Sequence, residues 1–346
     1  MTALRPISLM GLIAAIAALT AALAPPAFAD ELVVATFGGT FVDNSKKCHA
    51  TAFEKATGAT VKYVLGSSVQ TAAKLRAAGA RAEFDVAYMD SQIVKQAKAE
   101  GLLQPLEPAK ISQWPDLYEA SRDKDGYWVS MMFAGTIITY NTNLVKTPPT
   151  SWADLWKPEW KGKLAIPDIS GTSGQQFLMA AARLNGGSLE NIDPGFEAIK
   201  KLKPNVQMMY TQPDQLIPLF ERGDIAVAVW YTDRTGAAAA KGVPVAAAYP
   251  KEGAIGIVPT VSVPKASQKR ELAQKYISVL LSPEGQLCFA QTQFAGPTNK
   301  KVQLPPDLAK LVPSADIVPR MYFPDTDLVA KKFPEWSERW GREIAR

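Results

Sequence analysis

Apolar segments of strand length alternate along this chain with helical segments, and small polar loops join them. In the first part of the chain the apolar segments cover residues 32–36, 61–65 and 84–89. The segments between them repeat apolar residues at helical spacing, and residues 43–57 form a predicted helix that Gly58 closes. A strand–helix–strand order of this kind favours a parallel sheet with helices on both faces. The sequence therefore predicts an α/β fold.

A second set with the same pattern begins after Gly162. We predict strands at residues 163–166, 225–229 and 243–248, and a helix at residues 175–184. The chain has 346 residues, of which 47% are hydrophobic and 21% charged, so it is long enough for two domains with separate cores. We therefore expect two α/β lobes rather than one.

Residues 1–29 have the pattern of a secretory signal peptide. Arg5 supplies a basic start, an apolar stretch runs from Ile7 to Ala24, and Ala27-Phe28-Ala29 forms an A-x-A cleavage site. Prolines end the apolar stretch, which argues against a membrane-spanning helix. We expect cleavage before Asp30 and export to the periplasm, with no lipid anchor because no cysteine stands at the cleavage point.

The chain lacks the residues that several classes of function require. The net charge is +5, but lysine and arginine are scattered, so nothing indicates nucleic-acid binding. The one histidine, His49, follows Cys48 on a predicted helix, where adjacent side chains point about 100° apart and do not form a nucleophile–base pair. Cysteine and histidine are too few for a zinc cluster, and no phosphate-binding Gly-Lys-Ser/Thr motif occurs. We expect no enzyme activity, no cofactor and no resident metal.

The loops at the carboxyl ends of the predicted strands are the candidate ligand site. Ligands of open α/β sheets bind in that position, and loops rich in Gly, Ser and Thr leave backbone N–H groups at helix starts open to an anionic group. Each loop taken alone is also explained as an ordinary capped helix start, and it is the agreement of several loops that favours a site. The candidate ligand-binding residues in these loops are Phe37, Gly38, Gly39, Ser67, Ser68, Asp90, Gly171, Thr172 and Ser173.

Three segments carry a resemblance to a known family: FAGTIITYNTNLV at 133–145, SWADLWKPEWKGKLAIPD at 151–168 and IGIVPTVSVPKAS at 255–267. They resemble the type II extracellular solute-binding proteins of the spermidine and putrescine class, which serve ABC transporters. The resemblance implies a periplasmic receptor of two lobes that closes around a small molecule. It also implies an inner-membrane ABC permease complex as partner, and we expect the receptor to be a monomer.

The same resemblance implies how the chain is divided. Two crossing strands would join the lobes, with residues 30–136 and 260–296 in the first lobe and residues 137–259 and 297–346 in the second. Cys48 would lie on the first helix of the first lobe and Cys288 on a helix that returns to it. A disulfide within one lobe is therefore one alternative, and two buried free thiols are the other.

The ligand expected from the resemblance, a polyamine, does not suit the loops of this chain. Polyamine receptors hold ammonium groups with carboxylates in two loops, which here read ISGTS at 169–173 and IVPT at 257–260. Burying ammonium groups without paired carboxylates is costly. A polyamine is therefore disfavoured, although it stays an alternative.

The remaining candidate residues favour an acidic or zwitterionic ligand. The resemblance places Trp230 in an aromatic wall of the cleft, with Tyr231 and Arg234 beside it. The guanidinium of Arg234 has the geometry to clamp a carboxylate or phosphonate, unless it pairs with Asp233. Asp90 is the acidic residue we assign to an amine of the same ligand. We expect a small carboxylate, an amino-acid-like molecule or a phosphonate.

Ferric iron is the third alternative. Relatives with this fold carry iron on tyrosines and carboxylates, and Tyr210, Tyr231 and Asp233 offer oxygen ligands of the kind that suits a hard cation. The adjacent tyrosine pair typical of those relatives is absent, since Trp230 precedes Tyr231.

Overall fold

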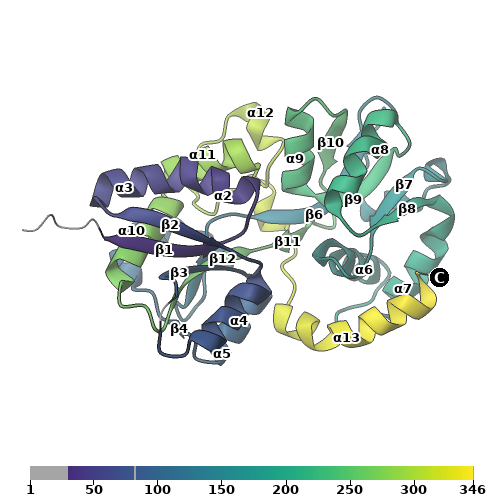
Figure 1. Cartoon of the computed structure of the whole chain (residues 1–346). Helices are drawn as coiled ribbons and strands as arrows, with labels where there is room; N and C mark the ends of the chain where they lie inside the picture. Colours follow the sequence, from purple (N-terminus) through teal and green to yellow (C-terminus); the bar gives the residue numbers. More distant parts are fainter. Residues whose placement is uncertain (1–29, 82, 346) are drawn as a thin grey trace, which may run out of the picture.

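The computed structural model describes residues 30–81 and 83–345. The predicted signal peptide and its cleavage site lie outside the described residues. The described chain folds into two lobes that stand side by side, each built on its own sheet (Figure 1). In the part of the chain that the structure describes, no helix has both the length and the apolar character needed to cross a membrane.

The first lobe has a sheet of strand order β2-β1-β3-β12-β4, with β5 also paired to β12. Its parallel centre comes from the predicted alternation of strands and helices, because β1 pairs in parallel with both β2 and β3. The strands are β1 (Glu31–Thr36), β2 (Thr60–Leu65), β3 (Val86–Asp90), β4 (Leu103–Gln104), β5 (Trp128–Ser130) and β12 (Pro259–Pro264). The helices are α2 (Thr40–Ser45), α3 (Thr51–Thr57), α4 (Ser68–Ala78), α5 (Ser91–Ala99), α10 (Arg270–Leu281) and α11 (Pro283–Gln293).

The second lobe has a sheet of order β10-β6-β9-β7-β8, with β11 paired to β6. The strands are β6 (Ala134–Asn141), β7 (Leu164–Pro167), β8 (Val206–Tyr210), β9 (Val227–Tyr231), β10 (Val245–Ala248) and β11 (Ile255–Ile257). The main helices are α6 (Thr172–Leu184), α7 (Asp193–Leu202), α8 (Leu216–Arg222), α9 (Thr232–Ala240) and α13 (Thr326–Glu343). The short helix α12 (Pro306–Ala309) lies in the segment that leads back to this lobe.

Both sheets are mixed rather than mostly parallel. The strands that follow one another within a lobe, β1 to β3 and β7 to β9, pair in parallel as predicted. A strand that arrives from the other lobe enters in the opposite direction, so β12 is antiparallel to β3 and β6 is antiparallel to β9. The antiparallel pairs are therefore a consequence of the crossings between the lobes.

The chain crosses between the lobes three times. The first two crossings lie between β5 and β6 and between β11 and β12, a few residues or less from the predicted boundaries at 136 and 259. The third comes later than the predicted boundary at 296, because Gln286 of α11 accepts the backbone N–H groups of Thr298 and Asn299 at 2.8 and 2.9 Å. Residues just after the predicted boundary thus still belong to the first lobe.

The third crossing packs onto the other two at a pair of glycines. A Cβ on Gly135 of β6 would lie 2.7 Å from the Met321 side chain, and one on Gly256 of β11 would lie 2.3 Å from the ring of Phe323. Since real Cβ contacts are longer than this, a side chain at Gly256 would displace the Phe323 ring, and one at Gly135 would push aside the tip of Met321. The missing side chains let all three crossing segments pack together at one place.

The predicted helix at 43–57 begins earlier, at Thr40, and contains a π-helical turn, η2 (Lys46–Ala50). Gly58 ends it with a φ of +73°, as predicted. Cys48 lies in the π turn and forms a disulfide with Cys288 of α11, with a Cα–Cα distance of 5.5 Å. Of the two alternatives for the cysteines, the structure has the disulfide, and it joins two helices of the first lobe.

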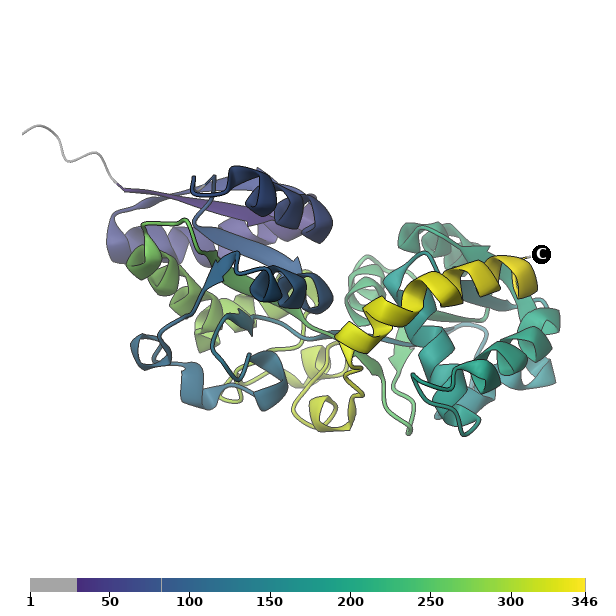
Figure 2. The same ribbon diagram turned by 90° about the horizontal axis from the view of Figure 1, so that it is seen from below.

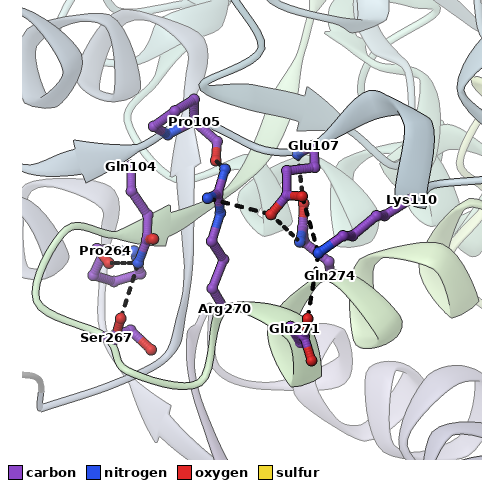
Figure 3. Close-up of polar contacts among 9 residues, drawn as sticks. All are labelled: Gln104, Pro105, Glu107, Lys110, Pro264, Ser267, Arg270, Glu271 and Gln274. Carbon is purple, nitrogen blue, oxygen red and sulfur yellow. Dashed lines mark hydrogen bonds and ion pairs between the residues drawn. The ribbon is translucent and has the colours of Figure 1, made fainter.

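Polar contacts fasten α10 to the segment that follows β4 (Figure 3). The amide nitrogen of Gln104 donates to the carbonyls of Pro264 and Ser267 at 2.8 and 3.0 Å. Arg270 of α10 pairs with Glu107 at 3.2 Å. None of the residues in this cluster lines the cavity described below, so we assign it a structural role.

The C-terminal helix α13 lies along the second lobe, and its first turn reaches the first lobe (Figure 2). Trp336 and Trp340 are buried in the core of the second lobe. At the other end of the helix, Asp327 pairs with Lys95 of α5 at 3.5 Å. The helix therefore contacts both lobes at one side of the space between them.

Candidate functional site

A cavity of about 260 Å³ lies between the lobes and has walls from both. Its size suits a metabolite smaller than the usual drug-sized ligand. The residues from the first lobe include Phe37, Phe41, Asp90, Ser91, Gln92 and Met132. Those from the second lobe include Thr172, Gln175, Gln176, Tyr231, Asp233 and Arg234.

Asp90 brings a carboxylate to the cavity from the end of β3. It stands at the N-cap position of α5, yet its carboxylate makes no hydrogen bond to its own helix. The carboxylate instead accepts the Ser68 hydroxyl at 2.9 Å, and the Ser68 oxygen accepts the Asp90 backbone N–H at 3.0 Å. Burial raises the pKa of Asp90. A side chain that gives up its capping bond and faces a cavity is available to a ligand.

The other predicted loop residues of the first lobe mostly support the site without lining it. Phe37 lines the cavity, whereas Gly38 and Gly39 are exposed beyond its wall. Ser67 caps α4 through a capping box, which is the ordinary alternative stated for this loop. Ser68 is buried and positions Asp90. Of the residues predicted in the first lobe, Phe37 and Asp90 thus line the cavity, whereas Gly38, Gly39, Ser67 and Ser68 do not.

Asp233 and Arg234 come from the first turn of α9 in the second lobe. Asp233 is half-buried, and burial raises its pKa, although the nearby Arg234 opposes this. Arg234 pairs with Asp214 at 3.4 Å, so the alternative pairing with Asp233 is not the one present. With 45% of its side chain exposed, Arg234 stands at the rim of the cavity. The sequence analysis assigned Asp233 no role toward an organic ligand, and the structure adds it to the cavity wall.

The expectation that Trp230 forms an aromatic wall is wrong. Trp230 is fully buried in the second lobe, where its ring packs on Phe220 with 6.0 Å between centroids. Successive side chains of a strand point to opposite faces, so the next residue of β9, Tyr231, is the one that reaches the cavity. Of the two neighbouring aromatic residues predicted at this strand end, Tyr231 lines the cavity and Trp230 does not.

Tyr231 also joins the starts of two helices that carry the site. Its hydroxyl oxygen accepts the backbone N–H of Ser173 at 3.0 Å, which ties the first turn of α6 to α9. The Ser173 side chain is buried against the Tyr210 hydroxyl, 3.3 Å away, and Gly171 is the N-cap residue of α6. Of the three residues predicted in this loop, only Thr172 lines the cavity.

One face of α6 was missed by the sequence analysis. Thr172, Gln176 and Met179 follow one another at helical spacing of four and three residues, and all three line the cavity. Gln176 is only 4% exposed. Its amide nitrogen donates to the Gly256 carbonyl at 3.0 Å, and its amide oxygen accepts the Thr136 hydroxyl. The available signal was a glutamine directly before the apolar stretch FLMAAA of a predicted helix.

The oxygen ligands suggested for ferric iron do not come together. Tyr210 is buried, donates its hydroxyl to the Val229 carbonyl at 2.9 Å and is not part of the cavity wall. Only Tyr231 and Asp233 of the suggested set line the cavity. Within the described residues, no group of three or more His, Cys, Asp or Glu side chains is placed to hold a metal ion.

Cys48 and His49 have structural roles. Cys48 is consumed by the disulfide. His49 is fully buried beside the ring of Phe289, with 5.0 Å between ring centroids, and burial lowers its pKa to about 3. A neutral imidazole in an apolar core, next to a sulfur that is already bonded, does not form a nucleophile–base pair.

Comparison with known proteins gives a consistent family. Residues 49–313 match the family described as bacterial extracellular solute-binding protein. The spermidine/putrescine-binding periplasmic protein of Escherichia coli is 28% identical over 302 residues, which cover 84% of this chain and 82% of that protein. The gamma-aminobutyric acid-binding protein of Pseudomonas aeruginosa is 26% identical over 312 residues, 85% of each chain.

The fold has a solved counterpart. The crystal structure of an ABC transporter protein from Clostridium perfringens superposes with a TM-score of 0.79 at 26% identity. The superposition covers 90% of this chain and 99% of that one. Both lobes and the crossings between them are therefore shared with a protein of known structure.

Proposed function

Because this chain belongs to the family of bacterial extracellular solute-binding proteins and is the solute receptor of an ABC importer, we propose a specific class of solute for it. The solute is a small zwitterion with an ammonium group at one end and an acidic group at the other, such as an ω-amino acid. We further propose that the mature protein works as a monomer in the periplasm and delivers the solute to an inner-membrane permease.

The observation that carries this proposal is the pair of carboxylates that face one cavity from different lobes. Asp90 belongs to the first lobe and Asp233 to the second. The charges of both carboxylates act on Tyr231, whose pKa is raised chiefly by burial and further by Asp233 and Asp90. An ammonium group bound there would contact both carboxylates and so connect the two lobes.

The acidic end of the solute has donors available in the second lobe. Arg234 uses one nitrogen toward Asp214 at the rim, and the guanidinium has further N–H groups. Thr172, Gln175 and Gln176 place a hydroxyl and two amides on the same wall. Cation and amides together suit a carboxylate better than a second ammonium group, which would need acceptors only.

Two carboxylates also favour a second candidate, a polyamine. The loops expected to hold polyamines lack carboxylates in this chain, but Asp90 and Asp233 supply them from other positions. The relative from Escherichia coli is named for spermidine and putrescine, and the one from Pseudomonas aeruginosa for gamma-aminobutyric acid. Arg234 in the cavity wall favours the zwitterion, because its charge would repel the far ammonium group of a diamine.

The mechanism follows from the crossings. A solute that contacts Asp90 on one lobe and Asp233 on the other binds the closed arrangement of the lobes better than an open one. Binding therefore shifts the population toward closure by rotation about the crossing segments. The receptor then presents the permease with a shape that differs between its empty and loaded forms.

The test compares gamma-aminobutyric acid with putrescine by calorimetry on the mature protein, at fixed salt and pH 7. We expect the amino acid to bind more tightly. Arg234→Ala should weaken its binding about tenfold to a hundredfold, because a charge-assisted bond is lost.

Arg222→Ala is the matched control, since Arg222 also pairs with an exposed aspartate, Asp224, at 2.7 Å, but lies outside the cavity wall. It should leave binding unchanged. Tighter binding of putrescine, unaffected by Arg234→Ala, would replace the zwitterion by the polyamine candidate.

A further inference from the structure

Gln176 differs from the other polar residues of the cavity because its amide is held by the protein on both sides. The residue lies on α6 in the second lobe and is 4% exposed, yet it belongs to the cavity wall. Thr136 of β6 donates its hydroxyl to the amide oxygen. The amide nitrogen donates to the Gly256 carbonyl of β11 at 3.0 Å.

These two contacts fix which way the amide points. A backbone carbonyl only accepts hydrogen bonds, so the nitrogen of Gln176 has to face Gly256 and the oxygen has to face Thr136. Rotating the amide by half a turn would set two oxygens against each other at Gly256. Thr136 is fully buried, so the arrangement is shielded from water that could replace either bond.

One hydrogen-bonding group of this amide is left over. An amide nitrogen carries two N–H groups, and one of them is used by Gly256. Among the described residues the second N–H of Gln176 has no acceptor. A buried donor without an acceptor costs free energy unless a ligand or water satisfies it.

We propose that Gln176 is a specificity-determining residue of the site and that its free N–H donates to the acidic group of the bound solute. This inference rests on the proposed function, because it assumes that the solute carries an acceptor at this end. The protein positions the donor before the solute arrives, so little orientational freedom is lost on binding.

The same donor selects against diamines. Both ends of a diamine are ammonium groups, which donate and do not accept. A bound diamine would therefore leave the N–H of Gln176 buried and unsatisfied. Sites that are built to hydrogen-bond one ligand reject the analogue that lacks the matching group.

The experiment replaces Gln176 by methionine, which keeps the length of the side chain and removes the amide. Calorimetry then gives the affinities for gamma-aminobutyric acid and putrescine. We expect Gln176→Met to weaken binding of the amino acid about tenfold and to leave putrescine bound at least as tightly as in the wild-type protein, so that the ratio of the two affinities falls at least about tenfold.

Two further variants separate recognition from folding. Gln286→Met removes another buried amide, which donates to Thr298 at 2.7 Å in the first lobe, and should lower stability without changing the affinity ratio. Thr136→Val keeps the amide of Gln176 and its bond to Gly256 but removes the contact that holds the amide oxygen. We expect Thr136→Val to lower the ratio of the affinities for the amino acid and putrescine less than Gln176→Met does. It also provides a second test if the methionine variant does not fold.

The outcomes are distinct. If wild-type protein prefers the amino acid and Gln176→Met weakens both ligands equally, the inference about Gln176 is overturned while the proposed function stands. If wild-type protein prefers putrescine, the proposed function fails first, and the inference falls with it. A selective loss of the amino acid in both Gln176→Met and Thr136→Val supports both.

Discussion

The two lobes share a sheet architecture but hold the helices at the cavity in different ways. In the first lobe the disulfide joins the π turn η2 to α11, and edge-to-face aromatic contacts hold Phe41 of α2 against Phe289 of α11 and Tyr88 of β3, with 5.3 and 5.7 Å between ring centroids. In the second lobe buried hydrogen bonds tie α6 and α9 to the crossing strands. Thr232 of α9, for example, accepts the Gly135 backbone N–H at 3.1 Å.

This difference separates two tasks. Covalent and apolar contacts are insensitive to the direction of polar groups, and they give the first lobe a firm wall with one carboxylate, Asp90. Hydrogen bonds fix the direction of each donor and acceptor, and they allow the second lobe to recognise the solute. Changes to the covalent and apolar contacts of the first lobe should therefore alter stability, and changes to the hydrogen bonds of the second should alter the choice of ligand.

The largest effect should come from removing the disulfide. Cys48→Ser with Cys288→Ser should lower the free energy of unfolding by about 2–5 kcal/mol, because the bridge no longer restricts the unfolded chain. Denaturation followed by circular dichroism, with and without reductant, measures this. Reductant should destabilise the wild-type protein by a similar amount and leave the variant unchanged. An unchanged free energy of unfolding in the variant would deny the disulfide a stabilising role in the first lobe.

Substitution of the two cavity carboxylates should show that both lobes contribute charge to solute binding. Asp90→Asn and Asp233→Asn should each weaken binding of the zwitterion about a hundredfold. Each substitution leaves the bound ammonium group with one carboxylate fewer in a buried site. Asp224→Asn is the control, since Asp224 pairs with Arg222 at 2.7 Å and neither residue lies in the cavity wall. Calorimetry on the three variants compares them. Equal losses for all three would mean that the carboxylates act through long-range charge and not through contact.

Affinity should also depend on pH in a predictable direction. Burial raises the pKa of Asp90 and of Asp233, so each accepts a proton at a pH where an exposed aspartate is still charged. An ammonium group binds the charged forms. As the pH falls through the raised pKa values, affinity should therefore drop, by about tenfold per pH unit for each carboxylate that becomes protonated.

The pH profile has an internal control. In Asp90→Asn, one titrating group is gone, and the fall of affinity toward low pH should become shallower. Affinity that stays constant from pH 8 down to the ordinary pKa of aspartate would contradict a role for either buried carboxylate in holding the ammonium group.

The smallest effects are expected from substitutions of two neighbouring residues of β9. Tyr231→Phe removes the acceptor of the Ser173 N–H and should weaken solute binding about fivefold, which corresponds to roughly 1 kcal/mol. Trp230→Phe should lower the free energy of unfolding by about 1–2 kcal/mol and leave affinity unchanged, since Trp230 lies in the core. A loss of affinity in Trp230→Phe with none in Tyr231→Phe would mean that Trp230, and not Tyr231, contacts the solute.

Much of the fold could be predicted from the sequence because strand and helix periodicity is local. The parallel centres of both sheets came from that pattern, and the lobe boundaries came from family resemblance. The pattern does not show where the chain passes from one lobe back to the other. Asn299 stays with the first lobe through the buried side chain of Gln286, and two residues so arranged leave no periodic signal.

The site was predicted in part for a related reason. Phe37, Asp90, Thr172, Tyr231 and Arg234 follow strand ends, and all of them line the cavity. Trp230 was misplaced because adjacent strand residues face opposite sides, and the sequence does not say which side is the core. Gln176 was missed because the face that a helix turns to a cavity is set by packing with other elements.

The glycine at position 135 has a consequence for how this receptor can change over time. It lies where the crossing segments pack together, outside the cavity wall, and a methyl group there would press on Met321. The methionine tip would have to move aside, and the Ile255 carbonyl, 3.0 Å from such a methyl group, leaves little further room. Since apparent affinity scales with the fraction of molecules already able to close, a change of packing where the crossing segments meet would act on uptake through the closing equilibrium rather than through a contact with the solute.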